Sequence, residues 1–128
     1  MSSAVSTAYL VVAAVAIAAN AFSGIAALVH YRPIVPAMAA AGVPESWLTF
    51  PIGTLKTAGA LGLLLGLIGV PLIGTAAAIG LVLFFVCAIY THVRATDYSA
   101  QFGLANGFLA LAVAALVLGL AMQGAFQS

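Results

Sequence analysis

Charge is scarce in this chain: its 128 residues include three Lys or Arg and two Asp or Glu, which together make up 4% of the sequence. Soluble proteins carry about 25% charged residues, so the composition excludes an ordinary soluble domain. Three basic residues also fall short of the Lys and Arg patch with which proteins bind nucleic acid. We therefore expect no nucleic acid partner.

Cysteine is equally scarce. Cys87 is alone and lies within an apolar run, so the sequence offers no internal disulfide, no CxxC pair for thiol exchange and no cluster for an iron–sulfur centre. A glycine-rich dinucleotide fingerprint is missing as well. His30 and His92 end apolar runs without a further ligand pattern, so we expect neither a haem nor another metal site.

Apolar residues, in contrast, make up 66% of the chain. A helix needs roughly 20 apolar residues to cross a bilayer, so the length allows about four spans and little else. We expect one all-α domain over residues 1–128, an integral membrane four-helix bundle with a short interfacial segment between its first two helices. The spans are expected at about residues 7–29, 52–68, 72–93 and 102–122.

One face of the first span carries small and polar residues at helical spacing: Asn20, Ser23, Gly24, Ala27, His30 and Tyr31. Small residues let membrane helices approach each other, and polar groups buried in lipid need partners. This face should therefore meet other helices. For Asn20, an interhelical hydrogen bond and a place in the floor of a pocket are both open.

The segment between the first two spans is interrupted by proline and glycine too often to cross a membrane. Its middle, residues 34–41, is expected to form a short helix on the membrane surface. Trp47 follows, and tryptophan commonly anchors at the level of the lipid headgroups. The segment could also close a pocket as a lid.

All charged residues and both histidines are expected at one membrane face. His92 ends the third span, where side chains lean back toward the bundle interior, and we expect the same of His30. Lys56 lies about one turn inside the second span, so its ammonium can reach back to the interface or enter a site. Because the other face has no Lys or Arg, the positive-inside rule predicts that the charged face is cytoplasmic.

Ionisable groups inside a membrane are costly and mark candidate sites. The candidate catalytic residues are His92, His30, Asp97 and Lys56. The candidate ligand-binding residues are Asn20, Ser23, Tyr31, Glu45, Trp47, Tyr90, Arg94 and Asn106. We expect the two histidines to line one polar pocket, although Arg94 and Asp97 also suit a purely structural role at helix ends.

Three stretches together carry a family resemblance: AAGVPESWL at residues 40–48, LKTAGALGLLLG at 55–66 and THVRATDY at 91–98. They resemble the DoxX-like family of small four-helix bacterial membrane proteins. The resemblance implies a multi-pass protein of the bacterial cytoplasmic (inner) membrane, associated with redox chemistry such as that of a thiosulfate:quinone oxidoreductase, with quinone as the implied cofactor. It also implies a recurrent histidine at His92, whereas many members carry an acidic residue where this chain has Lys56.

Two functions follow as hypotheses, beside a third reading in which the protein is purely structural or associated with transport. In the first, the protein binds a quinone-like or lipid-like molecule, or serves as an accessory subunit of a membrane redox system. In the alternative it is an intramembrane acid–base enzyme, an isomerase or hydrolase acting on a lipophilic substrate near His30 and His92. Expected partners are the lipid bilayer, a lipophilic small molecule, a membrane or redox protein, and a second copy of the chain. A cavity of roughly 300 Å³ or more would favour a small molecule over protein docking.

Overall fold

The computed structural model describes residues 3–127 and is all-helical over that range. Its four long helices are α1 (Ser3–Leu28), α3 (Thr54–Leu67), α4 (Pro71–Arg94) and α5 (Ala100–Gln127). Each of them, α3 together with the turns before it, is long and apolar enough to cross a membrane. The predicted four-helix membrane bundle is confirmed.

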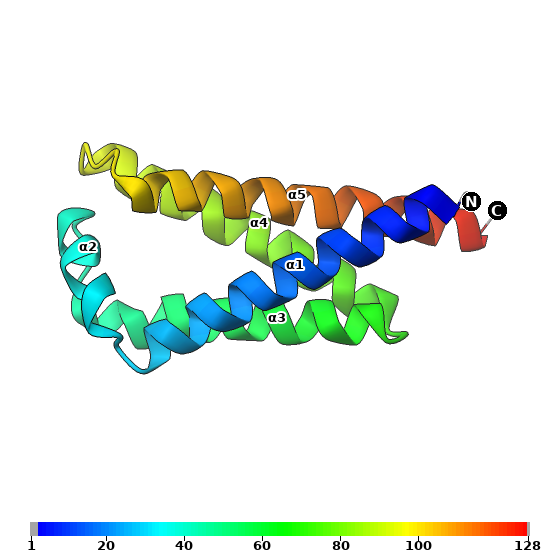
Figure 1. The fold of residues 1–128 in the computed structure, drawn as a ribbon, viewed down its shortest axis with the longest axis horizontal. Helices are drawn as coiled ribbons and strands as arrows, with labels where there is room; N and C mark the ends of the chain where they lie inside the picture. Colours follow the sequence, from blue (N-terminus) through cyan, green and yellow to red (C-terminus); the bar gives the residue numbers. More distant parts are fainter. Residues whose placement is uncertain (1–2, 128) are drawn as a thin grey trace.

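The helices are arranged so that α1 and α4 lie diagonally across the bundle. α1 packs mainly against α3 and α5, and α4 packs against the same two helices. Figure 1 shows α1 crossing in front of α4, with both chain termini at one end and the segment containing α2 at the other. At the α2 end of the bundle, α1 therefore finishes beside the start of α3, whereas α4 finishes beside the start of α5.

The α3–α4 hairpin is tightly packed near its turn. A Cβ added to Gly66 would lie 2.5 Å from the Cα of Gly74, and one added to Gly62 would lie 2.6 Å from the Cβ of Ala77. Small residues on both helices thus let the backbones approach closely. A Cβ added to Gly80 would meet nothing within 4 Å. Figure 1 shows the two helices separating as they run from their turn toward the α2 end.

The core lies where the four helices cross and combines alanines with larger side chains of α3 and α4: Ala16, Leu63, Ala78, Leu81, Phe85 and Ala112. Phe85 is 2% exposed. Its ring centroid lies 5.0 Å from that of Phe84 and 5.3 Å from that of Phe108, both in edge-to-face geometry. Such aromatic pairs add to the packing energy of the buried rings.

The segment between α1 and α3 folds into short helical pieces: η1 (Arg32–Ile34), α2 (Val35–Ala40), η2 (Glu45–Leu48) and η3 (Thr49–Gly53). Phe50 leaves the helical conformation, with φ −141° and ψ 131°, because the residue before a proline disfavours the helix. α3 itself has 14 residues, about 21 Å, so it is shorter than a bilayer core of ~30 Å. The preceding turns extend this membrane segment to Glu45–Leu67.

α1 ends at Leu28, and His30 follows it in the left-handed region with φ 52°. The backbone N–H groups of His30 and Tyr31 donate to carbonyls of the last helical turn, at 3.0 and 2.9 Å, which is how a left-handed residue closes a helix. Asn20 and Ala27 of the predicted polar face are buried inside the bundle, as expected. Tyr31 lies beyond the end of the helix and is exposed, so it does not belong to that face.

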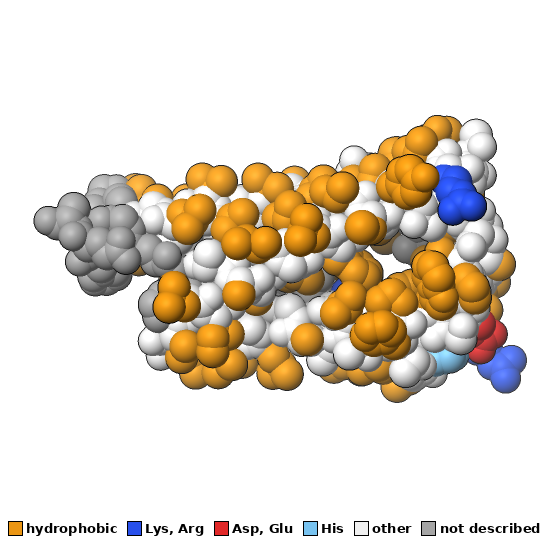
Figure 2. Space-filling view, turned by 180° about the vertical axis from the view of Figure 1, so that it is seen from behind, with side chains coloured by type: hydrophobic (Ala, Val, Ile, Leu, Met, Phe, Trp, Pro, Cys, Tyr) orange, Lys and Arg blue, Asp and Glu red, His pale blue; other side chains and the backbone are white. Residues whose placement is uncertain are grey.

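Charged side chains gather at the end of the molecule where α2 lies, as the face drawn in Figure 2 shows. The two loops at this end join α1 to α3 and α4 to α5, and they contain Arg32, Glu45 and Asp97. A Cβ added to Gly42 would lie 4.0 Å from the Cβ of Ala95. The segment containing α2 thus reaches across the end of the bundle to the other loop.

Candidate functional site

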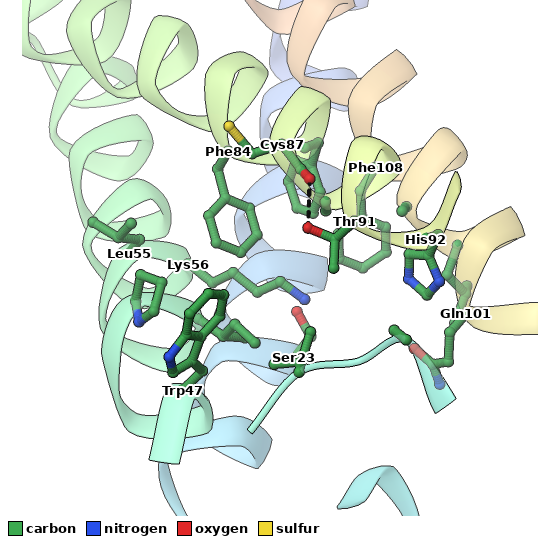
Figure 3. Close-up of a pocket in the computed structure, with 18 of the residues that line it drawn as sticks. Ser23, Trp47, Leu55, Lys56, Phe84, Cys87, Thr91, His92, Gln101 and Phe108 are labelled. Atoms are coloured by element: carbon green, nitrogen blue, oxygen red, sulfur yellow. Dashed lines mark hydrogen bonds between the residues drawn. The ribbon is translucent and has the colours of Figure 1, made fainter. Parts of the chain in front are cut away.

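A cavity of about 450 Å³ lies between the separated ends of α3 and α4 and is completed by α5. The segment containing α2 closes part of it through Met38, Ala41 and Val43. Figure 3 shows the polar side chains of its wall, and Figure 2 shows a hollow in the side of the bundle with a basic side chain in its depth. The volume exceeds the roughly 300 Å³ expected for a small-molecule site.

Lys56 points into this cavity. Its Nζ lies 5.2 Å from the ring centroid of Phe108, 5.5 Å from that of Phe85 and 5.9 Å from that of Phe84. These rings belong to the interior parts of α4 and α5, so the ammonium turns inward and not back toward the start of α3. Over residues 3–127 the structure records no ion pair or hydrogen bond for this side chain. Cation–π contacts are its electrostatic partners.

Three polar oxygens of α1 and α3 are buried without a hydrogen-bond partner among the described residues. The Oγ of Ser23, the Oγ1 of Thr57 and the Oδ1 of Asn20 are buried without a hydrogen-bond partner in the described part of the chain. The amide nitrogen of Asn20 donates to the carbonyl of Ala16 in its own helix at 2.9 Å, so its recorded hydrogen bond does not join two helices. Of these three residues only Ser23 lines the cavity. Buried polar atoms normally have partners, so the Ser23 hydroxyl is suited to bind water or a ligand there.

His92 forms the second polar point of the cavity. It lies in the last turn of α4, is 6% exposed, and its Nδ1 is 3.0 Å from the Oδ2 of Asp97. The backbone N–H of Asp97 also donates to the carbonyl of His92 at 2.9 Å, because Thr96, with φ 56°, closes α4 in the left-handed conformation. The helix end therefore positions the carboxylate against the ring.

Asp97 is ionised at neutral pH. Burial alone would raise the pKa of its carboxyl, but hydrogen bonds from Ser99 and His92 outweigh that effect and hold the pKa below its usual value. The carboxylate accepts from Nδ1, which leaves the Nε2 of His92 without a partner among residues 3–127. Figure 3 shows His92 and Gln101 together at one end of the cavity.

The structure does not bring His30 to His92. The Nδ1 of His30 lies 3.2 Å from the Oε2 of Glu45, its Nε2 lies 2.8 Å from the Oγ1 of Thr49, and the ring does not line the cavity. Two features separate the histidines: α1 and α4 are diagonal, and His30 lies beyond the helix, where the inward lean of helical side chains does not apply. Each histidine pairs with a carboxylate of its own.

A comparison with protein families matches residues 11–117 to the DoxX-like family. The chain belongs to the DoxX-like family. No curated protein and no solved structure matches it. With its four apolar segments, this DoxX-like protein is a multi-pass membrane protein in contact with the lipid bilayer.

Among the other sequence-based candidates of this DoxX-like protein, Ser23 and Trp47 line the cavity, and Asn20 is buried beside Ser23 in α1. Four further candidates do not line it and are exposed: Tyr31, Glu45, Tyr90 and Arg94. Asn106 is also exposed, and its amide donates to the carbonyl of Phe102 at 2.9 Å.

Sequence reasoning missed the aromatic wall of the cavity, formed by Phe84, Phe85 and Phe108, and the polar residue Gln101. Phenylalanine in an apolar span carries no signal of its own, because lipid-facing and core positions use it equally. Lys56 could have served as a signal, because a cation inside a membrane span is costly unless other groups stabilise its charge. Aromatic rings on neighbouring spans can do so through cation–π contacts.

Proposed function

We propose that this DoxX-like protein binds a lipophilic small molecule, quinone-like or lipid-like, in the cavity between α3, α4 and α5. The proposal rests on the cavity itself, which has a volume of about 450 Å³, mostly apolar and aromatic walls and a few polar side chains, Lys56 and His92 among them. Small-molecule sites have this composition, in which apolar walls supply affinity and a few polar groups fix orientation. A flat surface would have favoured docking of a redox protein instead.

The ligand enters from the bilayer. Leu55 of α3 and Leu83 of α4 both line the cavity and are 41% and 62% exposed, so they form an open margin between these two helices. The margin lies within the segments that are apolar enough to cross a membrane. Figure 2 shows the hollow on the side of the bundle and not at its tip. A molecule dissolved among the acyl chains can reach this opening without crossing water.

Gly80→Phe is expected to reduce the amount of lipophilic molecule retained by the purified protein about tenfold or more. A Cβ at Gly80 meets no atom within 4 Å, so the phenyl ring can occupy the cavity without displacing a helix. The ring takes space that a ligand would fill, and a tenfold loss of affinity corresponds to about 1.4 kcal/mol of binding free energy. Native mass spectrometry of protein extracted in mild detergent, followed by analysis of the organic extract, measures retention.

Gly107→Phe is the matched control. Gly107 also has nothing within 4 Å of an added Cβ, lies in a helix and does not line the cavity, so retention should equal that of the wild type. Equal retention by the Gly80 and Gly107 variants, or no retained molecule in the wild type, would contradict the proposed function.

A second candidate function, acid–base catalysis on a lipophilic substrate, is favoured by the arrangement of His92. Its ring is buried, lines the cavity and is held by an ionised carboxylate through Nδ1, while Nε2 has no partner in the described chain. A histidine held in this way by a carboxylate is the usual geometry of a general base. In an isomerase, Nε2 would take a proton from a substrate carbon, and a proton exchanged with solvent would return to another carbon.

For this second function, wild-type protein incubated with membrane lipids in deuterated water should introduce deuterium into C–H positions of one lipid class. His92→Gln should lower the rate at least about a hundredfold, because loss of a general base typically costs two to four orders of magnitude. Mass spectrometry of the extracted lipids measures the incorporation, with protein-free membranes as the blank. A wild-type sample indistinguishable from the blank removes this candidate.

A further inference from the structure

Lys56 is a cation without an acidic partner anywhere in the chain. The sequence contains two acidic residues, and both are engaged: Glu45 with His30 at 3.2 Å, and Asp97 with His92 at 3.0 Å. Neither acidic residue lines the cavity, so no side-chain carboxylate is available to Lys56. Any anion that neutralises this ammonium therefore comes from outside the chain.

The three phenyl rings around Nζ compensate the ammonium only in part. The ring faces attract a cation through their quadrupoles but carry no net charge, so the site keeps one positive charge in an apolar wall. A charge held within a membrane segment is costly and marks a functional site. The unmatched charge indicates a ligand that brings one negative charge.

We propose, building on the binding function above, that the cavity takes a lipophilic carboxylate, a monoanionic molecule with a single apolar chain, whose head group pairs with Lys56. Ser23 supports this assignment, because its Oγ is buried without a partner and Figure 3 shows it pointing to the same space as Nζ. The hydroxyl donates to the second carboxylate oxygen. A neutral quinone carbonyl would accept a hydrogen bond from Lys56 but leave its charge unbalanced.

The chain of the carboxylate lies along the apolar wall and leaves through the margin at Leu55 and Leu83. A volume of about 450 Å³ suits one molecule of modest size, at the lower part of the range for small-molecule sites. It does not suit a phospholipid with two chains and a large head group. Acetate, which has the charge but no chain, should not compete for the site.

Trp47 makes the proposal measurable, since it is the single tryptophan of the chain and lines the cavity. Protein in phosphatidylcholine nanodiscs at neutral pH is titrated with dibromostearic acid or with its methyl ester, and saturable quenching of Trp47 fluorescence gives the affinities. Wild-type protein should prefer the acid about tenfold or more, the size expected of a charge-assisted contact. Lys56→Met should bind acid and ester equally, with unchanged affinity for the ester.

Arg32→Met removes a cation at the same end of the bundle but outside the cavity, and it should keep the preference for the acid. Equal wild-type affinities for acid and ester, or a preference that survives in Lys56→Met, overturn the carboxylate assignment and leave the binding function standing. If neither probe quenches the wild type saturably, both fail.

A second measurement needs only the wild-type protein, so it does not depend on how Lys56→Met folds. The carbon NMR signal of carboxyl-labelled stearate should titrate about one pH unit lower with the protein than in protein-free nanodiscs, because a neighbouring cation favours the ionised carboxyl group. An unchanged titration overturns the carboxylate assignment.

Discussion

Gly66→Leu is expected to separate α3 from α4 and to lower the free energy of unfolding by about 3 kcal/mol or more. The added Cβ would lie 2.5 Å from the Cα of Gly74 and 3.1 Å from its nitrogen. Backbone atoms cannot rotate away as a flexible side chain would, so the helices must move apart. Overpacking of this kind costs about 1–3 kcal/mol and occasionally more, out of a typical total of about 5–15 kcal/mol.

The loss is measured by titrating the protein in mixed micelles with a denaturing detergent and following helical circular dichroism. Gly107→Leu is the control, because it makes the same substitution within a helix where an added Cβ meets nothing within 4 Å. Its stability should remain within about 0.5 kcal/mol of the wild type. If both leucine variants unfold at the same detergent concentration, the close α3–α4 contact does not hold the hairpin together.

Phe85→Ala is expected to cost about 3–5 kcal/mol, the range found when a buried aromatic side chain is removed and its neighbours relax only partly. Phe85 is 2% exposed and contacts two further rings edge to face. Its ring is also one of the three around the Nζ of Lys56. The same titration measures the effect.

Phe22→Ala serves as the comparison, because Phe22 is 79% exposed and lies on the outer surface of α1. Removing its ring leaves no cavity in the protein, so we expect a change within about 0.5 kcal/mol. Comparable losses in the two variants would show that the aromatic cluster contributes no more than a ring exposed on the outside of the bundle.

The fold was largely accessible from the sequence, because crossing a membrane depends on local properties. Apolar runs of sufficient length indicated four helices, and the interrupted segment after the first run indicated the short helix between the first two. The helical spacing of Asn20 and Ala27 correctly placed one face of α1 inside the bundle. The family could also be recognised from the sequence, because membership depends on motifs that can be compared residue by residue.

Parts of the candidate site could not be predicted, because they depend on conformation and packing beyond one helix. The inward lean expected of His30 assumed a helical residue, whereas this position has φ 52°. A positive φ at a residue other than glycine is difficult to predict from the amino-acid sequence. The reach of Lys56 was equally open, since a long side chain one turn inside a helix can turn either way until its neighbours are known.

By itself the sequence determined that four apolar helices cross the membrane, that charge gathers at one end, and that His92 lies at a helix end. Which carboxylate each histidine meets was decided by the structure. Only the tertiary structure decided which helices are neighbours, and hence that His30 and His92 are separated while Lys56 meets three rings. The physical reason is that hydropathy and backbone propensity act within one segment. The contacts that shape the cavity arise between α3, α4 and α5, where close glycine packing at one end of the hairpin leaves space at the other.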